Sequence, residues 1–513
     1  MKYPVKLAAS LAVATAGLLG TSALAADNVF TYAWSLDVED WDPAHAASTE
    51  PAVLYNIYEP LVWWDADAEG SFRPGLAESW SVDDSGLVWT FKLRDGVQFH
   101  DGTPLTAEAA KISFERSMAS EATGYTWMGV TEFKAVDDLT LEIHTAEPTA
   151  VLVAVSGTVG SFVVAPSASA QGEDWFRAGN AVGTGPYTLR QAKAGQQIVL
   201  DKFDDYWGGW DNDGTEIDRA VFRIVTEAST RVQMINSGEA DMVEDMPRDQ
   251  VAAMADDPNL NVYNLPTYQT VFWYMNHKKA PTDNKMVRQA IQHLWDRASI
   301  SQGIYAGQST PATSTVWSNY PGSKQFDLPE FDIEKARDLI EASGASTDDL
   351  KLSVAYISSF EEWKNICVLF QSNAAQVGIE VDCIPGELGT LWENALNPES
   401  YNMFGIIWWP DRMTLSGPMF LQYFSEEPMF NLGHYANADY DAAVLEAIGL
   451  EGTDMAASTA AFQKAQSILV DDAAAVWDQE ISAMVVLNSK WEGLSHNPAY
   501  NRWYSLRDLR LKQ

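Results

Sequence analysis

The segment 80–118 constrains the fold more than any other stretch of this chain, because it specifies a strand, two turns and a capped helix in a fixed order. Apolar residues recur at every second position from Leu87 to Leu93, which is the period of a strand with one buried face. Asp95-Gly96 then predicts a turn. Because the alternation resumes over Val97–Phe99, we expect the two runs to pair as a hairpin.

A helix is predicted directly after this hairpin. Asp101-Gly102 marks a second turn, and Thr106 is placed to cap the N-terminus of the helix. Ala110, Phe114 and Met118 recur every four residues, as one face of a helix requires. None of these residues is chemically reactive, so the segment predicts architecture and no catalysis.

The first residues have the pattern of a secretory signal peptide. Lys2 and Lys6 precede an apolar run, Leu7–Leu19, which is too short to span a membrane. Ala23-Leu24-Ala25 supplies a small-x-small cleavage site. We therefore expect residues 1–26 to be removed and the protein to be periplasmic, without a lipid anchor because no cysteine follows the cleavage site.

The chain of 513 residues is long enough for more than one domain, and its charge is strongly acidic. Lys and Arg number 33 against 71 Asp and Glu, which gives a formal net charge of −38. Nucleic acids and anionic membranes would be repelled, so we expect neither as a partner. Two interpretations remain open: a solvated surface suited to a salty habitat, or a field that gathers cationic ligands.

Helix and strand patterns mix along the rest of the chain without strict alternation. Lys351–Ile357, a helix from Glu361 and Ile379–Ile384 form a β-α-β unit. Cys367 lies early in that helix and Cys383 late in the strand after it, so a disulfide and two buried free thiols are both compatible with the sequence. Further strands are expected at 29–34, 221–225, 271–276 and 404–408, and further helices at 51–58 and from Ser229, Asp283 and Asp332.

The sequence contains none of the patterns on which common catalytic and metal sites are built. No two of the seven histidines have metal-ligand spacing on one helix face, and no Cys/His cluster exists. A nucleophile elbow, a phosphate loop and a dinucleotide fingerprint are also absent. We therefore expect no enzyme, no metal and no cofactor; a secreted glycan hydrolase acting through paired carboxylates is the alternative that the many acidic residues leave open.

The sharpest indication of a binding site is the run Ile-Ile-Trp-Trp-Pro-Asp-Arg at 406–412. A predicted strand ends in Trp408 and Trp409, and the proline that follows cannot continue its hydrogen bonding. Asp411 comes directly after this proline, at the carboxyl end of the strand. In α/β folds ligands collect at the carboxyl ends of strands, and a carboxylate flanked by indoles holds a cation by charge and by cation–π attraction. The alternative is that Asp411 caps a turn or pairs with Arg412.

The segment 80–118 closely resembles the signature of the large solute-binding proteins that feed peptide-type ABC transporters, the family 5 dipeptide and oligopeptide class. Similar stretches cover nearly the whole mature chain in the family's order: WDPAHAASTEPAVLYNIYEPLV, GTGPYTLRQAKAGQQIVLDKFDDYWGG, RVQMINSGEADMV, APTDNKMVRQAIQHL and FDIEKARDLIEASG. The resemblance implies an α/β protein with the two-lobed periplasmic binding protein fold (type II, cluster C) and an extra domain on lobe one. It assigns 27–277 and 487–513 to lobe one, 71–179 to the extra domain and 278–486 to lobe two, with crossings just after 271–276 and just after 483–487.

The resemblance also assigns ligand contacts. Asp411 stands where the oligopeptide branch has an aspartate that takes the ligand's α-ammonium, with Trp408 and Trp409 beside it. Trp392 stands where a ligand-facing tryptophan occurs, and 44–49 corresponds to a loop of lobe one that touches the ligand. The remaining candidates are Ala47, Ser48, Tyr268, Trp273 and Arg412.

The sequence departs from the family where peptide binders carry basic residues for the ligand's carboxylate. Gly405, Glu399 and Ser358-Ser359 stand near those places, and Arg412 is the candidate to compensate. We therefore expect the periplasmic component of an ABC importer, a monomer that captures a peptide or a related amine-bearing small molecule between its lobes and delivers it to permease subunits in the inner membrane. An opine, a glycoside or a metal chelate is the alternative cargo in the same fold.

Overall fold

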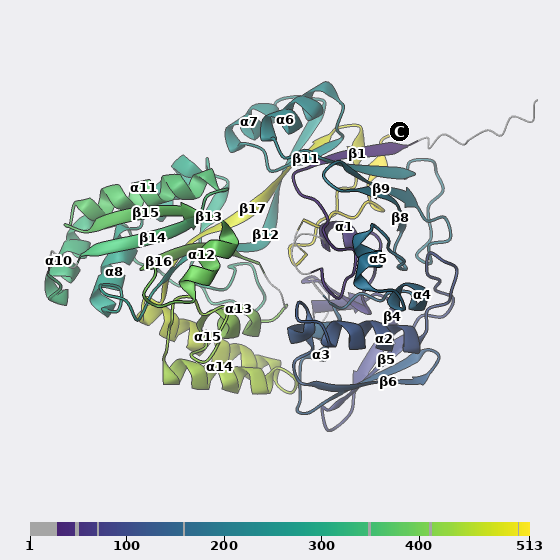
Figure 1. The fold of residues 1–513 in the computed structure, drawn as a ribbon, viewed down its shortest axis with the longest axis horizontal. Coiled ribbons are helices and arrows are strands. Elements are labelled where there is room, and N and C mark those ends of the chain that lie inside the picture. Colours follow the sequence, from purple (N-terminus) through teal and green to yellow (C-terminus); the bar gives the residue numbers. More distant parts are fainter. Residues whose placement is uncertain are drawn as a thin grey trace, which may run out of the picture.

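The computed structural model describes residues 28–46, 51–68, 71–156, 160–346, 350–409, 413–500 and 502–513, so the expected signal peptide lies outside the described residues. The chain forms two lobes side by side (Figure 1). Two long strands, β12 (Leu260–Met275) and β17 (Ala475–Asn488), run from one lobe into the other. Within the described part of the chain, no helix is both long and apolar enough to cross a bilayer.

The segment 80–118 belongs to a small antiparallel sheet of lobe one. In spatial order, its strands are β4 (Ala77–Val82), β5 (Val88–Leu93), β7 (Thr140–Thr145) and β6 (Val130–Asp137). The face of β5 predicted to be buried is buried, and helix α2 (Ala107–Met118) packs against β6 and β7. The predicted cap is confirmed, because Thr106 Oγ1 accepts a hydrogen bond of 3.1 Å from the amide of Ala109.

The hairpin expected over 87–99 is wrong. Strand β5 pairs with β4 on one side and with β7 on the other, so both of its edges are occupied. The chain after Gly96 instead makes a short loop, in which Gln98 bridges to Pro104 and the amide of Leu105 donates to the carbonyl of Val97. The alternation of apolar residues correctly predicted a strand. Its partner strands, however, lie elsewhere in the chain, and one of them follows about 50 residues later.

Among the described residues, eleven strands form one sheet that passes through both lobes, in the order β15-β14-β16-β12-β17-β11-β1-β10-β9-β8, with β13 paired beside β17. Lobe one contributes β1 (Val29–Trp34), β8 (Tyr187–Lys193), β9 (Gln197–Lys202), β10 (Arg219–Ile224) and β11 (Met242–Glu244). Lobe two contributes β13 (Ser309–Pro311), β14 (Lys351–Ile357), β15 (Glu380–Gly386) and β16 (Met403–Trp408). Strands β10, β1 and β11 run parallel to one another, as do β15, β14 and β16.

The β-α-β unit predicted in lobe two is present. Helix α11 (Glu361–Ala375) connects the parallel strands β14 and β15. Cys367 on α11 and Cys383 on β15 form a disulfide with their Cα atoms 6.1 Å apart. Of the two alternatives that the sequence left open, the structure therefore contains the disulfide.

The helix ends follow the local chemistry of the chain. In α10 (Ile333–Ser343), Asp332 accepts a hydrogen bond from the amide of Lys335, and Gly344 ends the helix in the left-handed conformation, as predicted. Two helices begin at positions that differ from those expected. Ser229, the expected cap, lies inside α6 (Ala228–Ser237), and α8 (Lys285–Leu294) is capped by Asn284 instead of beginning at Asp283. The other helices of eight or more residues are α12 (Leu388–Ala395), α13 (Ser416–Tyr423), α14 (Ala438–Leu450) and α15 (Met455–Asp471).

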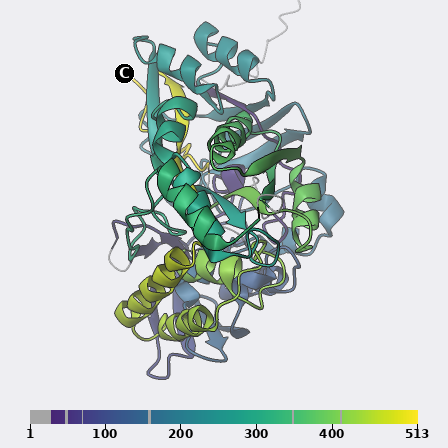
Figure 2. The ribbon, with the colours of Figure 1, turned by 90° about the vertical axis from the view of Figure 1, so that its left-hand side faces the viewer.

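Shorter elements complete the fold. The short helices are α1 (Pro51–Leu54), which is half as long as predicted, α3 (Val151–Val155), α4 (Pro166–Ser169), α5 (Glu173–Arg177), α7 (Arg248–Met254) and α9 (Arg297–Ser299). The short strands are β2 (Val62–Trp64), β3 (Phe72–Pro74), β18 (Trp491–Glu492) and β19 (Arg510–Leu511). Figure 2 shows α14 and α15 at the opposite end of the molecule from α6 and α7.

The register of β12 and β17 locates the passage between the lobes. Leu260–Leu265 pairs with 483–488, where β17 also pairs with β11 of lobe one, and Thr270–Met275 pairs with β16 of lobe two. The ladder shifts register between Leu265 and Gln269. Residues 266–269 therefore lie between the part of β12 that pairs in lobe one and the part that pairs in lobe two; the crossings and the limits of the lobes and of the extra domain stay predictions.

Candidate functional site

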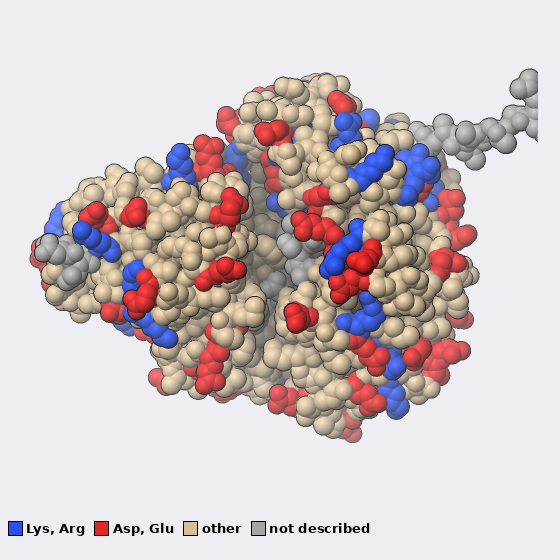
Figure 3. Space-filling view, in the orientation of Figure 1, with Lys and Arg blue, Asp and Glu red and all other residues tan. Residues whose placement is uncertain are grey.

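The surface is hollowed between the two lobes, and acidic side chains lie on both sides of the hollow (Figure 3). Strand β16 ends at Trp408, which is paired with Thr270 of β12. Thr270 directly follows the part of β12 that crosses between the lobes. The carboxyl end of β16, where ligands collect in α/β sheets, therefore lies at the junction of the lobes.

Three aromatic side chains form a row at this end of β16. The ring of Phe430 meets Trp408 edge-on, with centroids 5.5 Å apart and planes at 89°, and it meets Trp392 edge-on at 5.6 Å and 82°. Trp408 is buried, whereas Trp392, Phe430 and the adjacent Trp409 are half-buried. These half-buried rings leave aromatic surface that a cationic or apolar ligand group can contact.

The loop that carries Phe430 is held by a carboxylate. Glu427 Oε2 accepts hydrogen bonds from the amides of Met429, at 2.9 Å, Phe430, and Asn431, at 3.1 Å. The hydroxyl of Tyr274 donates to the carbonyl of Phe430 at 2.8 Å. The side chains of Glu427 and Tyr274 therefore fix the backbone of this loop and preorganise the position of Phe430 in the aromatic row.

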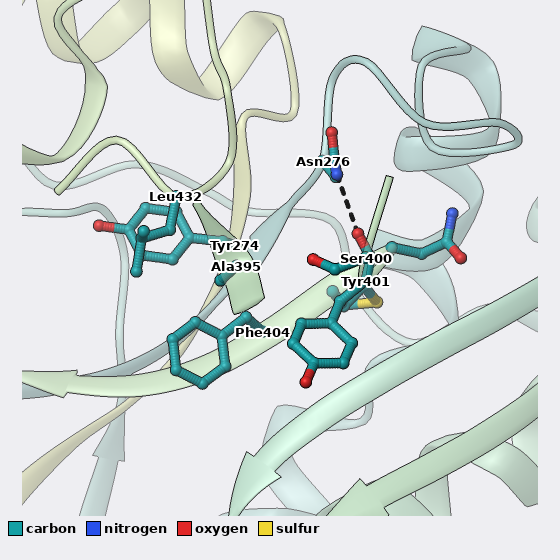
Figure 4. A pocket seen from close by; sticks show the side chains of 9 residues that line it. Tyr274, Asn276, Ala395, Ser400, Tyr401, Phe404 and Leu432 are labelled. Carbon is teal, nitrogen blue, oxygen red and sulfur yellow. Dashed lines mark hydrogen bonds between the residues drawn. The ribbon is translucent and has the colours of Figure 1, made fainter. Parts of the chain in front are cut away.

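Figure 4 shows a small pocket that Tyr274, Phe404 and Leu432 line beside this loop. Its volume of about 10 Å³ holds at most about one water molecule. In its wall, Asn276 Nδ2 donates to the carbonyl of Tyr401 at 2.9 Å and to that of Pro398 at 2.7 Å. This pocket is a packing defect and cannot hold a peptide.

Four of the predicted ligand residues, Asp411, Arg412, Ala47 and Ser48, lie outside the described residues, and their roles stay predictions. The neighbouring chain of lobe one is firmly anchored. Asp42 is fully buried, forms an ion pair with Arg116 and accepts a hydrogen bond from the amide of Ala44 at 3.0 Å. The carbonyl of Ala44 in turn accepts from Thr123 Oγ1 at 2.8 Å.

The other two candidates, Tyr268 and Trp273, are buried side chains of β12. Tyr268 lies at the crossing and contacts Trp64 of lobe one edge-on at 5.6 Å. Trp273 points into the core of lobe two, where its indole N–H donates to Asp478 at 3.3 Å. An ideal Cβ on Gly405 would lie 2.8 Å from the ring of Trp273, so this ring explains why no basic side chain stands at Gly405.

Three further residues have notable surroundings that the sequence alone did not indicate: Phe430 in the aromatic row, and the buried acids Glu59 and Asp478. No sequence motif marks Phe430, and nothing in the sequence distinguishes Glu59 and Asp478 from the many other acidic residues. Burial raises the pKa of Glu59 to about 7 and that of Asp478 to about 6. Both side chains are held by hydrogen bonds from tryptophan N–H groups, so they belong to the buried framework and form no exposed acid–base pair.

Two deeply buried histidines, His100 and His277, have structural roles. His100 Nε2 lies 2.9 Å from the carbonyl of Gly185, and burial lowers its pKa to about 4. Burial likewise lowers the pKa of His277 to about 3. Both imidazoles are neutral at pH 7, and the described part of the chain contains no group of three or more His, Cys, Asp or Glu arranged to hold a metal ion.

Two lobes that share one sheet, with an aromatic site where they meet, define the class of two-lobed ligand-binding proteins. The family model of the bacterial extracellular solute-binding proteins, family 5, matches residues 71–430. The chain belongs to this family, whose members bind solutes and do not catalyse reactions.

Known proteins are similar over nearly the whole chain. The probable D,D-dipeptide-binding periplasmic protein DdpA of Escherichia coli (strain K12) is 26% identical over 491 residues, which is 92% of each chain. The ABC transporter substrate binding protein CtaP of Listeria monocytogenes has a TM-score of 0.83 at 22% identity, covering 94% of this chain and 99% of that chain. NikA of Brucella suis, in complex with Fe(III)-EDTA, has a TM-score of 0.84 at 20% identity, covering 95% and 100%. The two-lobed fold expected from the sequence is confirmed.

Proposed function

We propose that this protein is the periplasmic solute-binding component of an ABC importer, and that it captures peptides or a related amine-bearing small molecule between its lobes. The observation that carries the proposal is the aromatic row at the end of β16, at the junction of the two lobes that β12 and β17 join. Membership of family 5 and the similarity to a dipeptide-binding protein support it.

The amine is the part of the cargo that the site favours most. Trp392, Trp409 and Phe430 offer half-buried aromatic faces, and a cation over such a face is attracted by roughly 0.5–2 kcal/mol. Asp411 stands two residues after Trp409 in the sequence and supplies the opposite charge, with Ala47 and Ser48 as the partners from lobe one. Arg412 would meet a carboxylate where Gly405 leaves no room for a basic side chain.

Delivery follows from closure of the lobes. A ligand that touches both lobes binds the closed form better than the open form and shifts the population toward it by that difference in affinity. The closed monomer then docks on permease subunits in the inner membrane. The signal-peptide pattern at 1–26 would direct export to the periplasm. The similar protein DdpA is described as periplasmic.

A metal chelate is the second candidate cargo. The fold is similar to that of NikA from Brucella suis in complex with Fe(III)-EDTA, with a TM-score of 0.84. A chelate needs no amine, so this candidate predicts binding that does not depend on Asp411.

Native mass spectrometry of the protein purified from periplasm, followed by denaturation and identification of the released molecule, tests the proposal. We expect a peptide or an amine-bearing conjugate, bound in calorimetry at least tenfold more weakly by Asp411→Asn than by wild type. Asp338→Asn, an exposed position on α10, is the matched control and should bind as wild type does. Release of a metal chelate, or equal affinity of the Asp411→Asn variant, would contradict the amine assignment.

A further inference from the structure

The two lobes touch at a point far from the strands that join them. The turn between α14 and α15 of lobe two lies against Pro148 and Thr149, which precede α3 in lobe one. The approach is close: an ideal Cβ on Gly452 would lie 3.0 Å from the carbonyl carbon of Pro148 and 3.0 Å from the amide nitrogen of Thr149. We call this packing of Gly452 on Pro148 and Thr149 the closure contact.

A second interlobe contact lies beside the crossing itself. Trp64 of lobe one stacks on Tyr320 of lobe two, with centroids 5.9 Å apart and planes at 11°, and both rings contact Tyr268 of β12. Trp64, Tyr268 and Tyr320 are all buried. Because Tyr268 belongs to the crossing strand, this aromatic cluster stays close to any axis about which the lobes rotate.

The two contacts respond differently to rotation of the lobes. The strands β12 and β17 cross in the upper half of the view in Figure 1, below α6 and α7, whereas α14, α15 and α3 lie toward the lower end. For one rotation about the crossing, displacement grows with distance from the axis. The aromatic cluster therefore moves little, and the closure contact separates early when the lobes open.

We propose that the closure contact sets the fraction of closed protein in the absence of ligand, and thereby the affinity for the cargo, without touching the cargo. The proposal rests on lobe closure as the mechanism of the proposed function. Apparent affinity falls in proportion to the population of the binding-competent form, so a change at this remote contact acts on binding only through that population.

Glycine at position 452 is favoured by the close approach of the neighbouring lobe and not by its own backbone conformation. Its φ lies outside the left-handed region, so alanine fits the conformation of the turn. The atoms that a Cβ would meet are backbone atoms of Pro148 and Thr149, which cannot rotate away as a flexible side chain does. Alanine at this position therefore disfavours the arrangement of the lobes in which the closure contact is made, and it meets no atom of lobe one once the lobes separate.

Position 449 provides the matched control. Gly449 lies in α14, three residues before Gly452, and no atom lies within 4 Å of its ideal Cβ. Gly449→Ala adds the same methyl group to the same part of lobe two without meeting lobe one. Gly452→Ser serves as a second substitution at the contact, so the test does not depend on a single variant.

Distances between spin labels on the full chain test the proposal. Labels are placed by Glu132→Cys on β6 and Glu446→Cys on α14, both exposed, while the native cysteines are joined to each other. Without ligand, we expect Gly452→Ala and Gly452→Ser to lower the closed-to-open ratio about tenfold, equivalent to about 1.4 kcal/mol, and Gly449→Ala to leave it unchanged. Circular dichroism and thermal unfolding establish that each variant is folded.

The probe for binding is a mixture of alanine di-, tri- and tetrapeptides. If the peptides shorten the distance in wild type while both Gly452 variants keep the wild-type distribution, the closure contact has no influence and the inference is overturned, although the proposed function stands. If both variants open the protein while no peptide changes the wild-type distance, the closure contact is supported and the proposed peptide cargo is not.

Discussion

Glu59 is a buried carboxyl group whose ionisation should oppose folding near neutral pH. It is 3% exposed, and its oxygens accept hydrogen bonds from Tyr206 Oη at 2.8 Å, Trp207 Nε1 at 2.7 Å and Thr184 Oγ1 at 2.9 Å. Burial disfavours the charged form and raises the pKa from 4.5 to about 7, although these hydrogen bonds act in the opposite direction. Glu59→Gln keeps the shape of the side chain and removes its proton equilibrium.

The sign and size of the effect follow from linkage. Below pH 4.5 the group is protonated in both the folded and the unfolded protein, so it contributes no pH dependence. Between pH 4.5 and about 7 the unfolded chain releases the proton while the folded protein retains it, so the free energy of unfolding falls as the pH rises. One pKa unit corresponds to about 1.4 kcal/mol, so the loss from this group is about 3 kcal/mol.

The glutamine variant fits the same contacts. Its amide oxygen can accept from Trp207 and Thr184, and its amide N–H can donate to the hydroxyl oxygen of Tyr206, at the position of the Glu59 oxygen that accepts from Tyr206 in wild type. We therefore expect wild type and Glu59→Gln to have similar stability near pH 4.5, and the variant to be more stable by about 3 kcal/mol above about pH 7.

Equilibrium urea unfolding at several pH values measures this difference directly. Contributions of other buried acids, such as Asp478, cancel because they are the same in both proteins. Glu78→Gln, at an exposed position of β4, is the control and should show no such trend. A difference between Glu59→Gln and wild type that stays constant from about pH 4.5 to pH 8 would refute the reasoning.

Three further perturbations test the local structure. Phe430→Leu removes two edge-on aromatic contacts worth roughly 0.5–1.5 kcal/mol each; it should lower the free energy of unfolding and change the near-UV circular dichroism of the tryptophans, unlike Phe331→Leu at an exposed position. Thr106→Ala removes the α2 cap and should cost about 1 kcal/mol in urea unfolding, whereas Thr106→Ser should be close to neutral. Reduction of the Cys367–Cys383 disulfide, which spans a sequence separation of 16, should lower stability by roughly 3 kcal/mol; an unchanged thermal midpoint in reductant would contradict this.

The local elements of this chain were predictable because their signals are local. Thr106 precedes apolar residues that recur every four positions, Asp332 and Gly344 mark the two ends of α10, and a short apolar run ends at Trp408. Each of these signals specifies a helix or a strand from neighbouring residues alone. The hairpin at 87–99 failed for the same reason: an alternating run identifies a strand but says nothing about its partner.

The candidate site was predictable only in part. Trp408 and Trp392 could be named from the resemblance to the family, and the structure joins them through Phe430, which no pattern marked. Trp273 was named for its position near the crossing, yet the twofold alternation of β12 turns its side chain into the core of lobe two, where it excludes a side chain at Gly405.

The sequence by itself determined the family, the acidic charge, the absence of catalytic patterns and most helix and strand positions, because each depends on residue identity or on spacing within one segment. The tertiary structure alone decided which strands pair, which aromatic rings meet, where burial raises the pKa of Glu59, and that Gly452 lies against Pro148 from the other lobe. The contact of Gly452 with Pro148, for example, joins residues 304 positions apart, and only the packing of the whole chain brings such residues together.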